Sequence, residues 1–350
     1  MTDRTVTATD LASKDQVLPP PPSRGPWVTA YRKLRSDGAA MAALFVLTVV
    51  IVLCLLAPVY AAYIAHTDPF RSNLSGKIEV GGATVPIMST STEGLGLGFT
   101  PISPTWDPRA YMLGADGQGR DVAARLLYGG HNSLLIAGVA TVVCLVLAAI
   151  VGLTAGFLGG WVDWVLSRCL DVLWAFPVYL LAISLSIVLI SHGIDIGPIS
   201  ITSGSLALPM FIIGIIFVPY VARPIRGQVL SLKESEFVLA AVGLGVPSHR
   251  ILLRDILPNV MTTLIVFVPL LMAINMVTES ALSFLSIGVQ PPDASWGTII
   301  QDGQGLLYTR PMVALAPGIA IALTVLTLNV FGDGLRDALD PRSKLRIGTT

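Results

Sequence analysis

The sequence predicts an all-α membrane protein with six transmembrane helices. Of its 350 residues, 53% are hydrophobic and only 13% are charged, and the mean hydropathy is +0.74. Ordinary soluble domains carry roughly 25% charged residues. The apolar residues are gathered in long runs without Asp, Glu, Lys or Arg, and each run can hold the ~20 apolar residues that a membrane-spanning helix needs.

The charge-free runs place these helices, because an ionised side chain at the centre of a bilayer costs at least roughly 2.5 to 3.5 kcal/mol. The runs are 38–67, 126–162, 172–194, 196–222, 256–278 and 311–332. We therefore expect transmembrane helices close to 39–64, 133–156, 171–191, 206–223, 259–282 and 312–332.

These helices divide the chain into parts that differ in polarity. The N-terminal tail contains the prolines from Pro19 to Pro22 and no apolar core, so we expect it to be disordered in the cytosol. The expected parts are the tail at 1–30, the first transmembrane helix at 31–65, an extracytoplasmic segment at 66–125, a core with five transmembrane helices at 126–335 that includes the loop 231–258, and a cytosolic C-terminal tail at 336–350.

The segment between the first two helices is too polar to enter a bilayer. Within it, two short apolar-alternating stretches, 77–80 and 83–85, flank Gly81-Gly82. Paired glycines supply the positive backbone dihedrals of a tight hairpin turn. We expect a small β-hairpin that either braces a partner protein or merely decorates the outer surface.

Lysine and arginine predict the orientation. With the N-terminus inside, 16 of the 22 basic residues lie on the inner side and 6 on the outer side. The positive-inside rule then places both termini and the loop 231–258 in the cytoplasm. The net charge of zero argues against a nucleic-acid-binding surface. The cysteines and histidines lack the spacing of a metal site, so we predict no metal and no catalytic residue.

The loop 231–258 predicts a helix, a turn and a second helix. Ala240 and Ala241 are small enough to let a partner's backbone approach. Phe237 and Leu244 are seven residues apart and can provide apolar anchors on the same helical face. Gly245 favours the left-handed conformation that ends a helix. These features are typical of a helix that docks onto a partner protein. An ordinary connecting loop would contain the same helix-breaking residues.

The same loop resembles the EAA loop of ABC-importer permeases. In that family the pattern is Glu-Ala-Ala, three residues, Gly, nine residues, then Ile-x-Leu-Pro, and here Leu239 and Asp255 depart from it. We expect the second helix to run from Ser248 to Pro258. The resemblance implies docking to a separate ATPase through Glu236, Phe237, Ala240, Ala241, Leu244, Gly245, Leu257 and Pro258.

Two further stretches resemble dipeptide and oligopeptide importer permeases. Residues 113–130 are similar to Leu-Gly-Thr-Asp…Gly-Arg-Asp…Arg-Leu-Tyr-Gly, and we expect an amphipathic helix there with Val122, Leu126 and Leu127 toward the membrane. Residues 161–177 match an Asp…Arg…Asp…Phe-Pro pattern. Its Asp163, Arg168 and Asp171 would lie at a cytosolic-edge gate or would simply anchor the helix, and Arg168 and Asp171 can pair on one face.

Residues 279–297 resemble the Leu-Ser-Phe-Leu-Gly-Leu-Gly-Val-Gln-Pro-Pro…Ser-Trp-Gly segment of peptide and nickel permeases, with Ser286 for one Gly. Glu279 lies inside an apolar run and should face protein or water rather than lipid. It either touches the translocation pathway or makes a packing hydrogen bond. The closing stretch 332–342 is similar to Gly-Asp…Leu-Arg-Asp…Asp-Pro-Arg.

By these motifs the chain is identified as a member of the binding-protein-dependent transport inner-membrane component family, as a C-type subunit. The resemblance implies the type I ABC-importer permease fold, a bacterial inner-membrane location and uptake of di- or oligopeptides. It also implies a second permease subunit, two ATPase subunits and an extracytoplasmic substrate-binding protein.

The chain lacks the Gly-x-x-x-x-Gly-Lys-Ser/Thr loop that cradles ATP phosphates. We therefore expect no enzyme activity and no cofactor in this chain, with ATP and Mg bound by the partner ATPases. The alternatives are a permease for nickel or another small solute, a self-sufficient secondary transporter, and a scaffold without a pathway.

Overall fold

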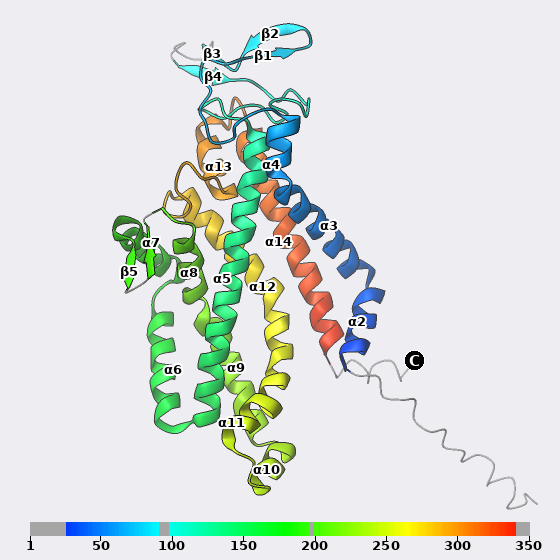
Figure 1. The fold of residues 1–350 in the computed structure, drawn as a ribbon, viewed down its shortest axis with the longest axis vertical. Helices are drawn as coiled ribbons and strands as arrows, with labels where there is room; N and C mark the ends of the chain where they lie inside the picture. The colour runs from blue at the N-terminus through cyan, green and yellow to red at the C-terminus, as the bar shows by residue number, and fades with distance from the viewer. Residues whose placement is uncertain (1–25, 91–97, 197–198, 203, 341–350) are drawn as a thin grey trace, which may run out of the picture.

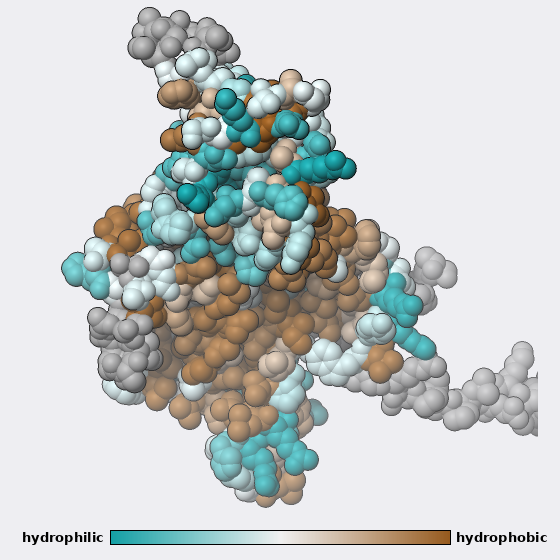
Figure 2. All heavy atoms as spheres, turned by 45° about the horizontal axis from the view of Figure 1, so that its top comes forward, coloured by the Kyte–Doolittle hydropathy of each residue, from teal (hydrophilic) through white to brown (hydrophobic). Residues whose placement is uncertain are grey.

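The computed structural model describes residues 26–90, 98–196, 199–202 and 204–340, and over these ranges the chain is a long helical bundle with a small β-rich insert at one end (Figure 1). The helix α10 (Glu236–Gly243), the start of α2 (Pro26–Ser36) and the end of α14 (Met312–Leu339) lie at the opposite end. We call the two ends the insert end and the α10 end. Figure 2 shows a broad apolar band between polar surfaces at the two ends.

The predicted all-α architecture is confirmed. Four continuous helical stretches are long and apolar enough to cross a membrane: α3 (Gly38–Leu55), α5 (Val122–Leu158), the stretch Ser248–Phe284 that ends in α12 (Leu257–Phe284), and α14. Two bent pairs also qualify: α6 (Gly160–Ala175) with α7 (Val178–His192), and α8 (Ala207–Ile216) with α9 (Val218–Lys233). Counting each pair as one span gives six within the described residues, as predicted.

Helix α5 runs through the centre of the bundle and packs against α8, α9 and α12. Small residues allow this packing: a Cβ added at Gly152 or Gly156 would come within 2.9 Å of backbone carbonyl oxygens of α9. The main core lies along this contact and includes Ile213, Val221, Ile225 and Val229. A central helix with small residues therefore fixes the spacing of its neighbours.

The third predicted span, 171–191, was wrong at its start. Helices α6 and α7 meet at 89°, and Phe176 between them is extended with φ −90° and ψ 141°. A proline disfavours the helical conformation at the residue before it, and Pro177 follows Phe176. The charge-free run could not reveal α6, because α6 itself carries Asp163, Arg168 and Asp171.

The second helix of the loop 231–258 does not end at Pro258, contrary to our expectation. A short α11 (Ser248–Arg250) passes into a π-helical turn, Ile251–Ile256, and then directly into α12. Proline has no backbone N–H, so inside a continuous helix it removes one i→i−4 hydrogen bond and crowds the preceding turn, which here is the wider π-helical turn. The π-helical turn therefore lets the chain continue into the membrane span without a break.

The part 31–65, which we expected to be a single transmembrane helix, contains a break at Asp37, whereas the predicted span 39–64 is helical almost throughout. Asp37 ends α2 and caps α3 by accepting hydrogen bonds from the amides of Ala39 and Ala40. After α3 the chain continues through α4 (Ala57–Val59) and a π-helical turn, Tyr60–Ile64. Helix α2 takes up 26–30, which we had assigned to the disordered tail, and the rest of that tail lies outside the described residues.

The predicted hairpin in the insert is confirmed. Strands β1 (Lys77–Val80) and β2 (Ala83–Pro86) pair antiparallel with Ile78 opposite Val85. Gly81 and Gly82 form the turn with φ of 59° and 82°, the positive values that such a turn demands. A second pair, β3 (Met88–Thr90) with β4 (Phe99–Pro101), was not predicted. Neither were β5 (Ile194–Ile196), β6 (Ile199–Ile201) and α13 (Trp296–Gly303) with its 3₁₀ extension Gln304–Leu306.

Candidate functional site

Helix α10 projects from the bundle (Figure 1), and several of its apolar side chains are exposed. Ser235 precedes it, and Gly245, with φ +76°, turns the chain back behind it. Leu244 at its end is 83% exposed. On the opposite side Val238 is buried in the main core and holds the helix in place. We define the docking face as the exposed residues Phe237, Leu239, Ala240, Val242 and Leu244.

The predicted coupling residues divide between this face and the bundle. Glu236 is exposed in the first turn of α10, where a carboxylate interacts favourably with the helix dipole. Ala241 is half-buried against the main core, as is Leu257, and Pro258 is exposed in the first turn of α12. Leu239 and Val242 are equally exposed but were not among the predicted coupling residues, although their apolar side chains in a polar loop could have indicated an exposed apolar surface.

Ion pairs join α6 to α9, the helix that leads into α10. The guanidinium of Arg226 donates two hydrogen bonds to the carboxylate of Asp163, one of them 2.6 Å from Nη2 to Oδ2. The carboxylate of Asp171 forms ion pairs with Arg223, at 3.0 Å, and with Arg168, at 3.1 Å. The predicted pairing of Arg168 with Asp171 is thus present. The three predicted gate residues lie on α6, and two arginines of α9, the helix before α10, pair with its two acidic residues.

Glu279 lies fully buried in α12, inside a cluster of serines. Its carboxylate accepts hydrogen bonds from Ser133 at 2.8 Å, Ser283 at 2.7 Å and Ser280 at 3.3 Å. Ser133 belongs to α5 and also accepts the amide N–H of Trp296. The carboxylate therefore links α5, α12 and the start of α13. The structure places it in protein interior rather than against lipid, as its charge predicted.

A cluster of four charged side chains lies at the insert end. We call Asp116, Arg120, Arg125 and Asp302 the outer ion-pair cluster. Arg120 lies 2.7 Å from Asp116 and 2.8 Å from Asp302, and Arg125 lies 2.9 Å from Asp302. Both arginines and Asp116 are buried. The cluster anchors α13 to the start of α5 and explains why charged residues occupy the segment 113–125.

The start of α5 therefore differs from the expected amphipathic helix. Asp121 caps it by accepting hydrogen bonds from the amides of Ala123 and Ala124, and the helix continues without a break into the membrane span. Val122 was expected to face the membrane and is instead fully buried beside Trp296 and Ala294. Leu126 and Leu127 are half-buried.

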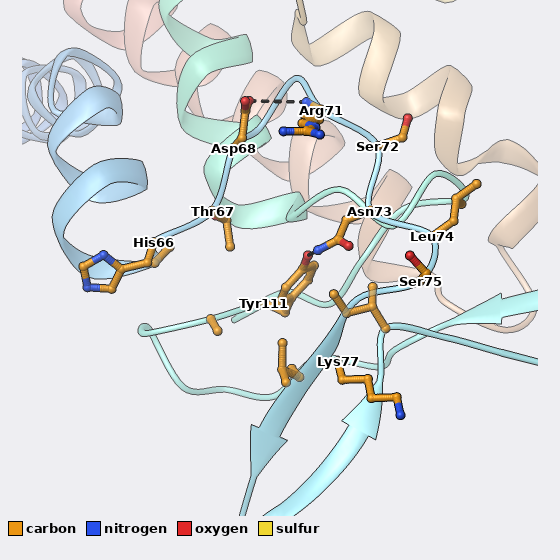
Figure 3. Close-up of a pocket in the computed structure, with 14 residues that line it drawn as sticks. His66, Thr67, Asp68, Arg71, Ser72, Asn73, Leu74, Ser75, Lys77 and Tyr111 are labelled. Carbon is orange, nitrogen blue, oxygen red and sulfur yellow. Dashed lines mark hydrogen bonds between the residues drawn. The ribbon is translucent and has the colours of Figure 1, made fainter.

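The insert contains a pocket of about 520 Å³ beside the end of the first span (Figure 3). Asn73 donates a hydrogen bond to the hydroxyl of Tyr111 at 3.2 Å, and Tyr111 donates to the carbonyl of Gly119. Burial raises the pKa of Tyr111, which keeps this phenol protonated as a donor. Figure 3 shows His66 and Lys77 extending away from the Asn73–Tyr111 pair, so the basic groups do not converge on one ligand.

A second pocket of about 520 Å³ opens beside the outer ion-pair cluster, between α13 and the loop 286–293. Among the residues that the structure describes, no three His, Cys, Asp or Glu side chains gather as metal ligands would.

Two family models match separate parts of the chain. Residues 148–345 match the family described as "binding-protein-dependent transport system inner membrane component". Residues 25–75 match the "N-terminal TM domain of oligopeptide transport permease C".

Curated relatives agree with these matches. The dipeptide transport system permease protein DppC of Alkalihalophilus pseudofirmus is 32% identical, over 97% of this chain and 99% of that protein. The oligopeptide transport system permease protein OppC of Bacillus subtilis is 34% identical, over 90% of each. The glutathione transport system permease protein GsiD of Escherichia coli is 31% identical, over 96% of this chain and 95% of that protein.

Proposed function

We infer that this chain, which belongs to the binding-protein-dependent transport system inner membrane component family, is a permease subunit of an ATP-driven importer of di- or oligopeptides. It is a multi-pass protein of the inner membrane with the fold of this permease family. The observation that carries the proposal is the docking face, an apolar surface held outside the membrane-spanning part of the bundle. Such a helix suits a groove on a partner protein.

We propose four partners for the assembled importer. A second permease subunit completes the translocation pathway, because this chain forms half of it. Two ATPase subunits bind ATP and Mg, and one of them receives the docking face. An extracytoplasmic binding protein delivers the peptide at the insert end. The hydrolytic activity belongs to the complex, since this chain lacks the phosphate-binding loop.

The proposed orientation places the α10 end in the cytoplasm. Helices α2, α10 and the end of α14 share that end, which supports a common side for the docking face and for both termini (Figure 1). The excess of basic residues on that side favours the cytoplasm by the positive-inside rule. An ATPase that uses cellular ATP can reach the docking face only there.

The proposed mechanism is a rigid-body movement driven by the ATPases. When the ATPases close on ATP, they displace α10, which follows α9 after a two-residue connection. The Arg226–Asp163 and Arg223–Asp171 pairs then transmit the movement to α6. The energy comes from the difference in ATP affinity between the two conformations. The pathway thereby alternates between inward and outward access.

The Arg226–Asp163 pair gives a direct test of this transmission. Replacing Arg226 with Ala should lower the peptide imported per ATP hydrolysed, because hydrogen bonds to charged groups contribute about 1.5 to 3 kcal/mol. The exchange Asp163→Arg with Arg226→Asp should restore part of the coupling. Uptake and hydrolysis are measured together in proteoliposomes. Arg109→Ala, at an exposed position of the insert, serves as the control. Unchanged stoichiometry in Arg226→Ala would remove these pairs from the mechanism.

The substrate class is tested by competition in the assembled complex. Uptake of a radiolabelled dipeptide is measured with excess unlabelled di-, tri- and pentapeptides and with nickel salts. We expect peptides to reduce uptake and nickel to leave it unchanged. Competition by nickel alone would assign the chain to the metal-importing members of the family. Uptake by this chain alone, driven by an ion gradient, would instead show a secondary transporter.

A further inference from the structure

Helix α2 is amphipathic and lies at the α10 end beside the last turns of α14 (Figure 1). One face packs inward: Ala30 is buried, Leu34 approaches Gly334, and the ammonium group of Lys33 donates to the carbonyl of Asp337. The other face is exposed and consists of Trp27, Val28, Tyr31, Arg32 and Arg35.

The exposed face combines aromatic and basic side chains in register. Trp27, Tyr31 and Arg35 follow one another at intervals of four residues and therefore lie along one row of the helix. Trp27 is 52% and Tyr31 63% exposed. The helix contains no acidic residue. Among the residues that the structure describes, no carboxylate pairs with Arg32 or Arg35.

The exposed face of α2 lies next to the exposed apolar side of α3, the first span. Both α2 and α3 pack on α14, and Ala40, Ala43 and Leu47 form the buried side of α3. The side of α3 that points away from the bundle carries exposed apolar residues such as Phe45 and Val49. Trp27 and Tyr31 thus stand where an apolar membrane surface gives way to a polar end of the molecule. Tryptophan and tyrosine favour this depth, at the level of the lipid headgroups.

We propose that α2 is an interfacial helix that binds anionic lipid headgroups. Arg32 and Arg35 contact the lipid phosphates, while Trp27 and Tyr31 insert among the headgroups and hold the helix at the surface. Under the orientation proposed above, the leaflet is the cytoplasmic one, which carries anionic lipid. The binding itself depends neither on that orientation nor on the transported substrate.

Quenching of Trp27 fluorescence by brominated lipid tests the proposal. The purified full-length chain is placed in nanodiscs of phosphatidylcholine with a minor fraction of phosphatidylglycerol in both leaflets, and bromine is carried by one lipid or the other at equal density. The contribution of Trp27 is the fluorescence of the unmodified chain minus that of the Trp27→Phe variant. Each arginine near an anionic membrane surface strengthens the attraction to that surface by a factor of about five. We therefore expect several-fold stronger quenching when phosphatidylglycerol carries the bromine.

The arginines are tested with a matched pair of variants. Arg32→Gln with Arg35→Gln should abolish the preference for phosphatidylglycerol but retain quenching by either lipid. Arg71→Gln with Lys77→Gln, which removes the same charge from the insert, should keep the preference. Equal quenching by both lipids in the unmodified chain would overturn the proposal, as would no quenching at all. Loss of Trp27 quenching on assembly of the full complex would assign the face to a protein partner instead.

Discussion

The variant Leu244→Asp is expected to abolish ATP-driven uptake while the chain remains folded and inserted in the membrane. Leu244 is 83% exposed, so its side chain contributes little to the packing of the bundle. Buried in a groove on a partner, a leucine contributes about 1.5 to 3 kcal/mol. An aspartate there adds the cost of burying a charge without a partner. The two effects together should weaken ATPase binding on the order of a thousandfold.

The measurement is ATP-driven peptide uptake in vesicles, together with recovery of the ATPase on the purified permease. Leu74→Asp provides the control, because Leu74 is also exposed but lies in the insert at the other end of the molecule. Phe237→Asp should behave like Leu244→Asp, since both residues belong to the docking face. Normal uptake by both docking-face variants would show that the ATPase binds elsewhere.

Replacement of Asp116 with Asn is expected to have the largest effect on stability. Asp116 is fully buried, accepts the guanidinium of Arg120 at 2.7 Å and lies 3.4 Å from Arg125. Removing its charge leaves two buried guanidinium groups with Asp302 as their remaining carboxylate. Breaking a buried ion pair costs about 3 to 5 kcal/mol, because the partner is left uncompensated. The midpoint of thermal unfolding in detergent should therefore fall by roughly 5 to 10 °C.

Asp171→Asn is the matched control for this variant. Asp171 also pairs with two arginines, but both pairs are exposed to solvent. Exposed ion pairs contribute about 0 to 1 kcal/mol, so its unfolding midpoint should barely move. Equal shifts in the two variants would mean that the outer ion-pair cluster does not stabilise the insert end as its burial indicates.

The membrane spans could be predicted because the bilayer excludes charge from each run. The same criterion failed at α6, where Asp163 and Arg168 lie in a helix that bends at Pro177 and joins α7 at 89°. It placed the start of the first span correctly, because Asp37 both ends the charge-free run and caps α3, but it did not predict α2 as a separate helix before it. The hairpin at Gly81 could be predicted because its turn is encoded locally.

The candidate site could be predicted in part, for a related reason. Phe237 and Leu244 follow from helical spacing within one short loop, and the structure exposes both. The partner of Asp163 could not be predicted, because Arg226 lies 63 residues away and meets it only through the packing of α6 on α9. Glu279 was expected to face protein or water rather than lipid, but its partner Ser133 could not be predicted because it comes from another helix. Contacts between helices require the fold, whereas contacts within a turn do not.

Cross-linking from position 244 tests the central claim, that this chain transmits the work of a separate ATPase through α10. A photoreactive amino acid replaces Leu244 in the full-length chain, and membranes that contain the native complex are irradiated. We predict a covalent adduct with an ATP-binding subunit, and no such adduct from the same group at position 74. Adducts with lipid alone, or with no nucleotide-binding protein, would contradict the account.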